Sequence, residues 1–180
     1  MENEILFHNQ YRIPTTRASW NDYNCGWYHV IICTKNKSCF FGHIDSEGLH
    51  LSESGIYFDN VINEIPRHHP YARPYLWQVM PNHVHIMLCI TTDLKKEDTS
   101  FQHPALLAIV IRGIKAAVTR FTRQNGIPFQ WQTRYYDVII KSSAQFRDTE
   151  VYVKNNVLHW QDDKYNPDNS TPENDKIPLC

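Results

Sequence analysis

Two short apolar segments separated by a tight turn restrict this chain more than any other feature of its sequence. Residues 75–80 and 83–90 are rich in aromatic, β-branched and large apolar side chains, and Pro81-Asn82 lies between them. Strands joined by so short a turn pair as antiparallel neighbours. The second strand begins with His83-Val84-His85, and residues two apart on a strand point to the same face of the sheet. The pattern therefore predicts two imidazoles aimed at one point, and imidazole is a common metal ligand.

The histidine pair also has a simpler explanation. In that case one ring would face solvent and the other would form ordinary surface hydrogen bonds. A short motif in a chain with ten histidines is by itself only a hypothesis about a site. The rest of the chain has to decide between the two interpretations.

The order of the remaining elements is typical of one fold class. Further strands are predicted at 27–34 and 135–141, helices at 52–65, 104–124 and 143–160, and a small hairpin at 39–51. Apart from the hairpin the order is β-α-β-β-α-β-α, and its first six elements form the ferredoxin-like, split βαβ unit. We expect an α+β domain: an antiparallel sheet with helices on one face, its first and third strands central, and an additional C-terminal helix.

Composition limits the class of protein. The 180 residues are 42% hydrophobic, enough for one domain with a substantial core. No apolar run reaches transmembrane length, and the acidic start is not a signal peptide, so we expect a cytoplasmic protein that is not bound to a membrane. The odd number of five cysteines, without a Cys-x-x-Cys pair, favours reduced thiols. We expect an extended arm at 1–24, a catalytic domain at 25–160, and a polar, disordered tail at 161–180.

The charge is distributed unevenly along the chain. The net charge is only −1, but the region 104–147 contains seven basic residues and one acidic residue, a local net charge of +6. One interpretation is a solvated helix face, and the other is a surface for a nucleic-acid backbone. The residues concerned are Arg112, Lys115, Arg120, Arg123, Arg134 and Lys141, followed by Arg147.

Two polar residues of the last predicted helix share one face. Tyr152 and Asn156 are four positions apart, the spacing that brings side chains together on a helix. A phenol is a possible nucleophile, and a carboxamide oxygen can bind a hard cation. Without other evidence, a tyrosine on an amphipathic helix is usually a residue at the edge of the core.

These residues together carry a family resemblance. The segment Pro81-Asn82-His83-Val84-His85-Ile86-Met87-Leu88 resembles the histidine signature of the single-tyrosine transposases in the HUH endonuclease superfamily. The segments 131–141 (WQTRYYDVIIK) and 152–156 (YVKNN) resemble the C-terminal half of the REP-associated branch. The resemblance extends from about Tyr28 to Trp160, which is most of the chain.

The resemblance implies a mechanism and a site. His83, His85 and Asn156 would bind a divalent metal, Mg²⁺ or Mn²⁺, and Tyr152 would be the catalytic nucleophile. The enzyme would cleave and rejoin single-stranded DNA, hairpin-flanked or repeat-associated, through a 5′-phosphotyrosine intermediate. The basic residues would then lie beside the site and hold DNA. The REP-associated branch favours a monomer, and the insertion-sequence branch implies a domain-swapped dimer. Such a protein would be bacterial and nucleoid-associated when bound to DNA.

Two other functions stay open at this point. One is a domesticated protein that binds repeat hairpins without mobilising DNA. The other is a metallohydrolase that activates water, which would need a further carboxylate or histidine ligand, and none follows His85 at short spacing. Tyr135 and Tyr136 are competing tyrosines, although they lie on a predicted edge strand. The sequence does not indicate a general base for Tyr152.

Overall fold

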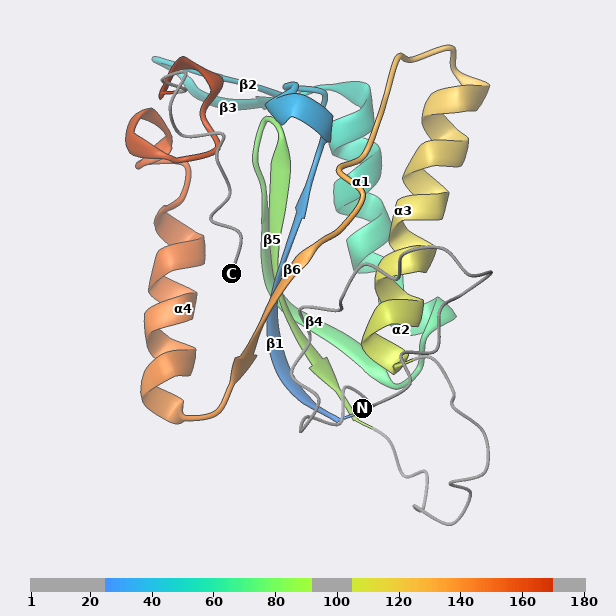
Figure 1. Cartoon of the computed structure of the whole chain (residues 1–180), viewed down its shortest axis with the longest axis vertical. Helices are drawn as coiled ribbons and strands as arrows, with labels where there is room; N and C mark the ends of the chain where they lie inside the picture. The colour runs from blue at the N-terminus through green and yellow to red at the C-terminus, as the bar shows by residue number, and fades with distance from the viewer. Residues whose placement is uncertain (1–24, 92–104, 170–180) are drawn as a thin grey trace, which may run out of the picture.

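The computed structural model describes residues 25–91 and 105–169 (Figure 1). The predicted arm at 1–24 and the end of the predicted tail, 170–180, lie outside the described residues. The elements in chain order are β1 (Gly26–Cys33), η2 (Lys35–Lys37), β2 (Gly42–Asp45), β3 (Gly48–Leu51), α1 (Glu53–Asn63), α2 (Ile65–His68), β4 (Ala72–Val79), β5 (His83–Ile90), α3 (Leu106–Gln124), β6 (Tyr136–Ile140), α4 (Ser143–Asn155), η3 (Trp160–Asp162) and η4 (Pro167–Asn169), where η denotes a 3₁₀ helix.

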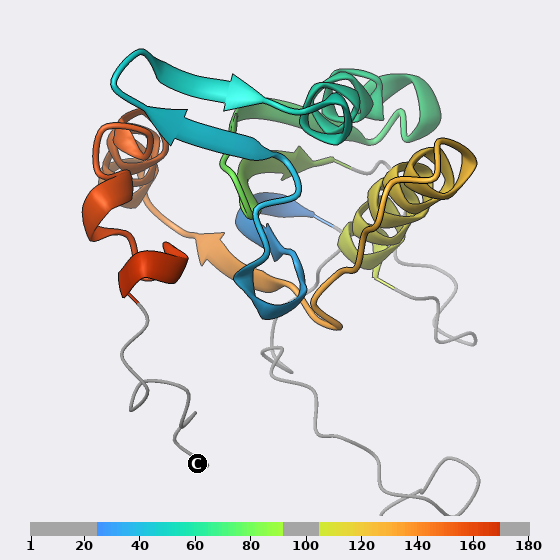
Figure 2. The ribbon, with the colours of Figure 1, turned by 90° about the horizontal axis from the view of Figure 1, so that it is seen from above.

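The main sheet has the predicted topology. Its strand order is β4-β5-β1-β6, and every neighbouring pair is antiparallel. The first and third strands of the ferredoxin-like unit, β1 and β5, are therefore the central pair, as the sequence predicted. Helices α1, α2 and α3 cover one face of this sheet and α4 lies against the other (Figures 1 and 2). The hairpin β2–β3 forms a separate two-stranded sheet.

The sheet separates a large apolar core from a smaller one. Alternate residues of β1 and β5 point toward α1 and α3 and are fully buried there, among them Val30, Ile86 and Leu88. The opposite face carries a second cluster in which Met87, Ile140 and Val153 pack beneath α4. The side chains of β5 are buried on both faces, apart from the partly buried Cys89, which is expected of a central strand between two helical layers.

Local sequence signals explain where the helices begin and end. Ser52 caps α1 by accepting a hydrogen bond from the amide of Gly55, and Ser142 caps α4 in the same way through Gln145, because serine satisfies the unpaired amides of a first turn. Gly126 follows α3 with a φ of +66°, the left-handed conformation that closes many helices.

Two boundaries differ from the sequence prediction. The last helix ends at Asn155 and not near residue 160, and the chain continues through turns into η3. The catalytic domain was expected to end at residue 160, with a polar tail after it, yet residues up to 169 pack on the domain. Trp160 and Asn166 are buried, at 7% and 2% exposure. The amide of Asn166 donates to the carbonyl of Trp160, so polar residues secure this segment through side chain to backbone bonds rather than through apolar content.

Candidate metal centre and nucleophile

The His83 and His85 side chains meet on the α4 face of the sheet. Both rings are fully buried, and their Nε2 atoms are 2.9 Å apart. The prediction that strand spacing brings the two imidazoles together is confirmed in its geometry. Neither ring faces solvent, so the simpler explanation of a surface pair is wrong.

A third histidine, which the sequence analysis did not select, extends this pair. His29 on β1 is 8% exposed, and its Nε2 lies 2.9 Å from Nδ1 of His85. Because Ile31 is the register partner of His85, His29 occupies the diagonal position on the same face. The sequence shows that His29 lies on the same face of its strand as Trp27 and Ile31. It does not show the register of β1 against β5, which brings His29 to His85.

The preceding residue orients His83. Asn82 is 1% exposed, and its Nδ2 donates to the carbonyls of Lys37 and Tyr165. Its Oδ1 is therefore the acceptor for Nδ1–H of His83, at 2.8 Å. This bond leaves the Nε2 lone pair of His83 directed toward His85, which is the arrangement that second-sphere partners impose on metal-binding histidines.

The three rings are neutral at physiological pH. Burial lowers the pKa of His29 from 6.5 to about 4 and that of His83 to about 3, and it lowers the pKa of His85 in the same direction. Desolvation disfavours the charged form of an imidazole. Since only the neutral ring has a lone pair for a metal, the cluster is held in its metal-binding form.

Tyr152 reaches the histidines from α4 of the same chain. Its ring lies edge-on to the ring of His85, with centroids 5.3 Å apart, and 6.0 Å from that of His29. The side chain is 47% exposed, so a substrate has access to the phenol. Partial burial raises the pKa of Tyr152, and the negative charge of Asp163 acts in the same direction.

Asn156 follows one turn later and is 3% exposed. Its Nδ2 donates to the carbonyl of Tyr152 at 3.1 Å. This bond fixes the carboxamide along α4 and makes Oδ1 the atom with which Asn156 would bind a metal.

The segment after α4 contributes residues to this site, and those beyond Trp160 were predicted to belong to the tail. The ring of Tyr165 lies 4.5 Å from that of His83, and Trp160 stacks on the other side at 6.3 Å. Asp163 places Oδ2 3.8 Å from Nε2 of His83. His83, His85 and Asp163 form a group that could hold a metal ion, with all three ligand atoms within 4.8 Å of one another. An isolated aspartate in a polar segment gives no sequence signal for this role.

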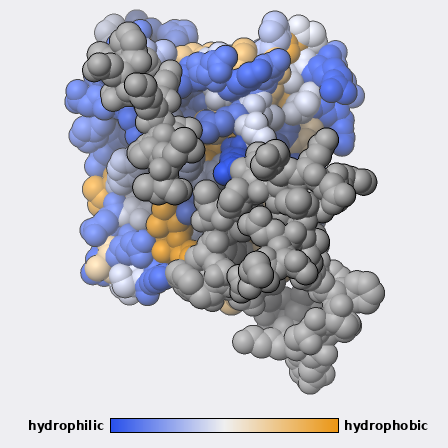
Figure 3. Space-filling view, viewed as in Figure 1, coloured by the Kyte–Doolittle hydropathy of each residue, from blue (hydrophilic) through white to orange (hydrophobic). Residues whose placement is uncertain are grey.

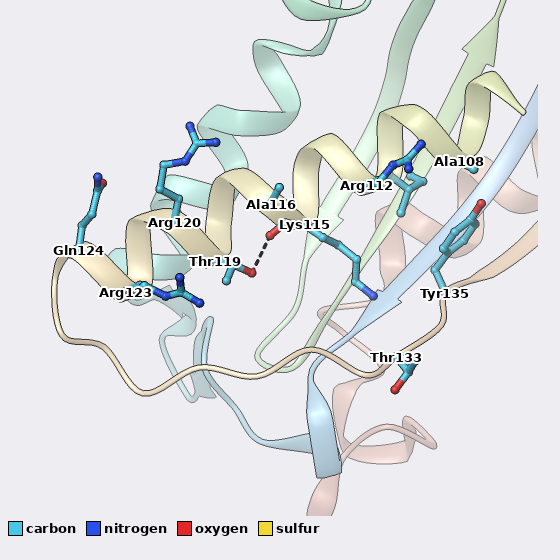
Figure 4. Close-up of a pocket in the computed structure, with 11 residues that line it drawn as sticks. Ala108, Arg112, Lys115, Ala116, Thr119, Arg120, Arg123, Gln124, Thr133 and Tyr135 are labelled. Atoms are coloured by element: carbon cyan, nitrogen blue, oxygen red, sulfur yellow. Dashed lines mark hydrogen bonds between the residues drawn. The ribbon is translucent and has the colours of Figure 1, made fainter. Parts of the chain in front are cut away.

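The basic residues of α3 lie on the other side of the sheet. Arg112, Arg120 and Arg123 line an open cavity of about 720 Å³ between α3 and residues 133–135 (Figure 4). Because α3 covers the face opposite α4 (Figure 1), the expectation that these residues lie beside the histidines is wrong. Lys115 is half-buried and bonds to the carbonyl of Gln132 at 2.7 Å, so it holds the loop after α3 in place.

The other two predicted DNA-binding residues are separate from this cavity. Arg134 is exposed on the approach to β6. Lys141 follows β6 and lines a smaller cavity with Trp27 and Phe146. The six basic residues thus occupy three locations and not one face.

A second cavity lies next to the α3 cavity. It has a volume of about 880 Å³, contains Lys35 and Lys37, and shares Thr119 and Thr133 with the α3 cavity. Its lining also includes Asn82 and Tyr165, both of which contact His83. The two cavities are therefore neighbours, and the second one reaches residues that contact His83.

Helix α4 covers only part of its sheet face. It packs on β4 and β5, and Tyr136 and Val138 of β6 stay 49% exposed. Figure 3 shows hydrophobic surface between α4 and β6. The sheet face beside Tyr152 is thus an accessible apolar floor.

Comparisons with known proteins identify relatives of the chain. No model of a known protein family matches it. An uncharacterised protein of Haemophilus influenzae is 31% identical in an alignment 155 residues long, which covers 77% of this chain and 84% of that protein. The chain belongs to the family of this Haemophilus protein.

The fold has a solved counterpart. The structure of a REP-associated tyrosine transposase bound to a REP hairpin aligns with a TM-score of 0.53 and 17% identity, over 81% of this chain and 73% of the transposase chain. The protein therefore has the fold of a tyrosine transposase, as the resemblance predicted. A candidate transposase from Deinococcus radiodurans aligns less well, with a TM-score of 0.41 and 17% identity over 79% of this chain and 97% of that one.

Proposed function

We propose that the protein is a metal-dependent DNA transposase and endonuclease that cleaves and rejoins single-stranded DNA through Tyr152. The observation that carries this proposal is the position of Tyr152, half-exposed and edge-on to the buried histidines of its own chain. A surface tyrosine without this neighbourhood would have no partner for phosphoryl transfer. The position also supports a monomer, because one chain supplies both halves of the site.

His83, His85 and Asn156 would hold the metal, Mg²⁺ or Mn²⁺. The donor set fits, since two neutral imidazoles present their Nε2 atoms within 2.9 Å and Oδ1 of Asn156 is a hard ligand. A bound divalent ion supplies electrostatic stabilisation of charge that develops on the phosphate. The described residues supply the nucleophile, its orientation through α4, and a buried floor of imidazoles.

The reaction exchanges one phosphodiester bond for another. Oη of Tyr152 bonds to the phosphorus while the bond between phosphorus and the 3′-oxygen breaks, and the phenolic proton is replaced by the 5′-phosphoryl group while the 3′-oxygen leaves as a hydroxyl. The covalent intermediate retains the energy of the phosphodiester bond. A second 3′-hydroxyl can reverse the step, so strands are joined without nucleotide hydrolysis.

The DNA would follow the two neighbouring cavities. Arg112, Arg120 and Arg123 would bind backbone phosphates far from the chemistry, where a hairpin could be held. Lys35 and Lys37 line the path toward Asn82. Unpaired bases would lie on the exposed Tyr136 and Val138 beside Tyr152, because aromatic and apolar surfaces accept bases of any sequence.

Aromatic residues elsewhere contribute to packing instead. Trp131 donates from Nε1 to Oγ1 of Thr119 and packs edge-on against Phe58 and Phe129. Trp27 packs against Tyr75 and Phe146. Their indoles stabilise the protein, so base stacking is assigned to β6.

A covalent-trapping assay tests the proposal. The protein is incubated with Mn²⁺ or Mg²⁺ and labelled single-stranded DNA that carries a hairpin and flanking sequence, and an SDS-resistant adduct is sought. We expect an adduct that disappears in Tyr152→Phe and persists in the matched control Tyr136→Phe. An adduct in Tyr152→Phe would remove Tyr152 from its role. Cleavage without an adduct would favour the metallohydrolase, and hairpin binding without cleavage would favour the domesticated binding protein.

A further inference from the structure

The carboxylate of Asp163 is held in a fixed position next to the histidines. Its side chain is 6% exposed. Oδ1 accepts a hydrogen bond from the backbone amide of Tyr165 at 2.7 Å, an Asx turn that fixes the carboxylate plane. Oδ2 is then the oxygen that points to Nε2 of His83, at 3.8 Å.

The segment that carries Asp163 is fixed from both sides. Before it, Trp160 is buried and its carbonyl accepts from Asn166. After it, the carbonyl of Tyr165 accepts from Nδ2 of Asn82 at 2.7 Å, and Asn82 also orients His83. One side chain therefore positions both a histidine and the segment with the aspartate, so their relative placement is built into the fold.

Oδ2 of this carboxylate faces the histidine cluster and is the atom available to a cation. The contact with His83, at 3.8 Å, is too long for a hydrogen bond. Lys164 and Lys37 act on Asp163 only through space. A buried carboxylate normally has a cation or a metal as its partner.

Two imidazoles, a carboxamide and a carboxylate fit Mg²⁺ or Mn²⁺ better than the imidazoles and the carboxamide do without the carboxylate. Magnesium and manganese favour carboxylate oxygens, whereas imidazoles alone favour zinc or copper. Asn156 adds oxygen but no charge. Asp163 adds an anionic oxygen, and its ligand atom lies within 4.8 Å of those of His83 and His85.

We propose that Asp163 is a protein ligand of the divalent metal, together with His83 and His85. This inference rests on the proposed function for its choice of ion and goes beyond the ligand set that the resemblance implies. Residues 160–169 are then a wall of the catalytic site.

Binding of Mn²⁺ alone, measured by titration calorimetry without DNA, tests this proposal. A second group of potential ligands, His43, Asp45 and His50 on the exposed hairpin β2–β3, is first removed by His43→Ala and His50→Ala, so that only the buried site is observed. In this background we expect Asp163→Asn to weaken Mn²⁺ binding by about 10- to 100-fold or more, since even partners of metal ligands contribute that much. Asp162→Asn, an exposed neighbour with the same charge change, should bind as the parent does.

Asparagine keeps the acceptor for the Tyr165 amide, so the variant retains the turn. If Asp163→Asn does not fold, Asp163→Ser is measured instead, because serine also accepts in such a turn. Unchanged Mn²⁺ affinity in the folded variant, or a parent that binds no Mn²⁺, overturns the proposal. The trapping assay is scored separately. Weakened Mn²⁺ binding in Asp163→Asn with no DNA adduct in the parent would leave Asp163 a ligand and refute the proposed function. Unchanged Mn²⁺ binding in Asp163→Asn with a DNA adduct in the parent would refute the role of Asp163 and leave the proposed function standing.

Discussion

Replacing His29 by leucine should weaken metal binding without removing any proposed ligand. In the metal-free cluster, His85 can donate from Nε2 to His83 and accept at Nδ1 from His29. A metal on both Nε2 atoms requires the other tautomer, in which Nδ1–H of His85 donates to Nε2 of His29. His29 is thus the acceptor that makes the metal-binding tautomer of His85 possible, and leucine cannot accept.

The magnitude follows from the burial of this bond. His29 is 8% exposed and His85 is fully buried, so the donor left in the variant has no water to replace its partner. An unsatisfied buried donor costs about 1–3 kcal/mol, which corresponds to about 5- to 150-fold in an equilibrium constant. The metal-free variant loses a contact as well, so we expect the lower part of that range, about 5- to 20-fold weaker Mn²⁺ binding.

Titration calorimetry with Mn²⁺ measures this effect in the background without the hairpin histidines. His29→Gln should recover most of the affinity, because its Oε1 can accept from Nδ1 of His85. His68→Leu is the matched control, since His68 is exposed at the end of α2. An affinity of His29→Leu equal to that of the parent, with the fold intact, would refute the tautomer argument.

Three further predictions address pH, packing and salt. The pKa values of His29 and His83 are lowered from 6.5 to about 4 and about 3, so below pH 6.5 the unfolded chain binds protons that the folded chain does not. The metal-free protein should therefore lose stability as pH falls from 6.5 toward 4. Urea titrations at several pH values should show a smaller loss of unfolding free energy in His29→Leu, and an equal loss in both proteins would contradict the burial of His29. Gly55→Ala should destabilise by about 1–3 kcal/mol in thermal unfolding, although alanine normally favours a helix, because its Cβ would lie 2.1 Å from the carbonyl oxygen of Phe41; a higher midpoint would show that α1 can move away. Arg120→Ala with Arg123→Ala should reduce the slope of log K against log salt for single-stranded DNA by about 1.4 and leave trapping at saturating DNA intact. The control is Arg67→Ala, an exposed residue of α2 that is paired with Glu64. An unchanged slope in the double variant would remove the α3 cavity from the DNA path.

The sequence predicted the sheet because periodicity and turns are local signals. Strand β5 was predicted with its observed bounds, and the two-residue turn before it correctly made β4 its antiparallel neighbour. The approach of Tyr152 to the histidines followed from the resemblance and not from local pattern. Only the family's topology says that a helix after the edge strand returns across the sheet.

The parts that escaped prediction depend on long-range placement. His29 needed the register of β1, which sequence alternation does not contain. The basic residues were assigned beside the site because their charge was visible and the side of the sheet occupied by α3 was not. Asp163 lies in a segment with little apolar content, and its position is set by bonds to Asn82 more than eighty residues earlier in the chain.

That bond has a consequence for the order of events during synthesis. The hairpin β4–β5 has local contacts and can form early, whereas α4 and the wall at 160–169 reach it only by closing long stretches of chain, which is entropically slow. A nascent chain exposes its histidines before it carries Tyr152 or Asp163. The phosphoryl transfer proposed for Tyr152 therefore requires that α4 and the segment 160–169 have left the ribosome and docked.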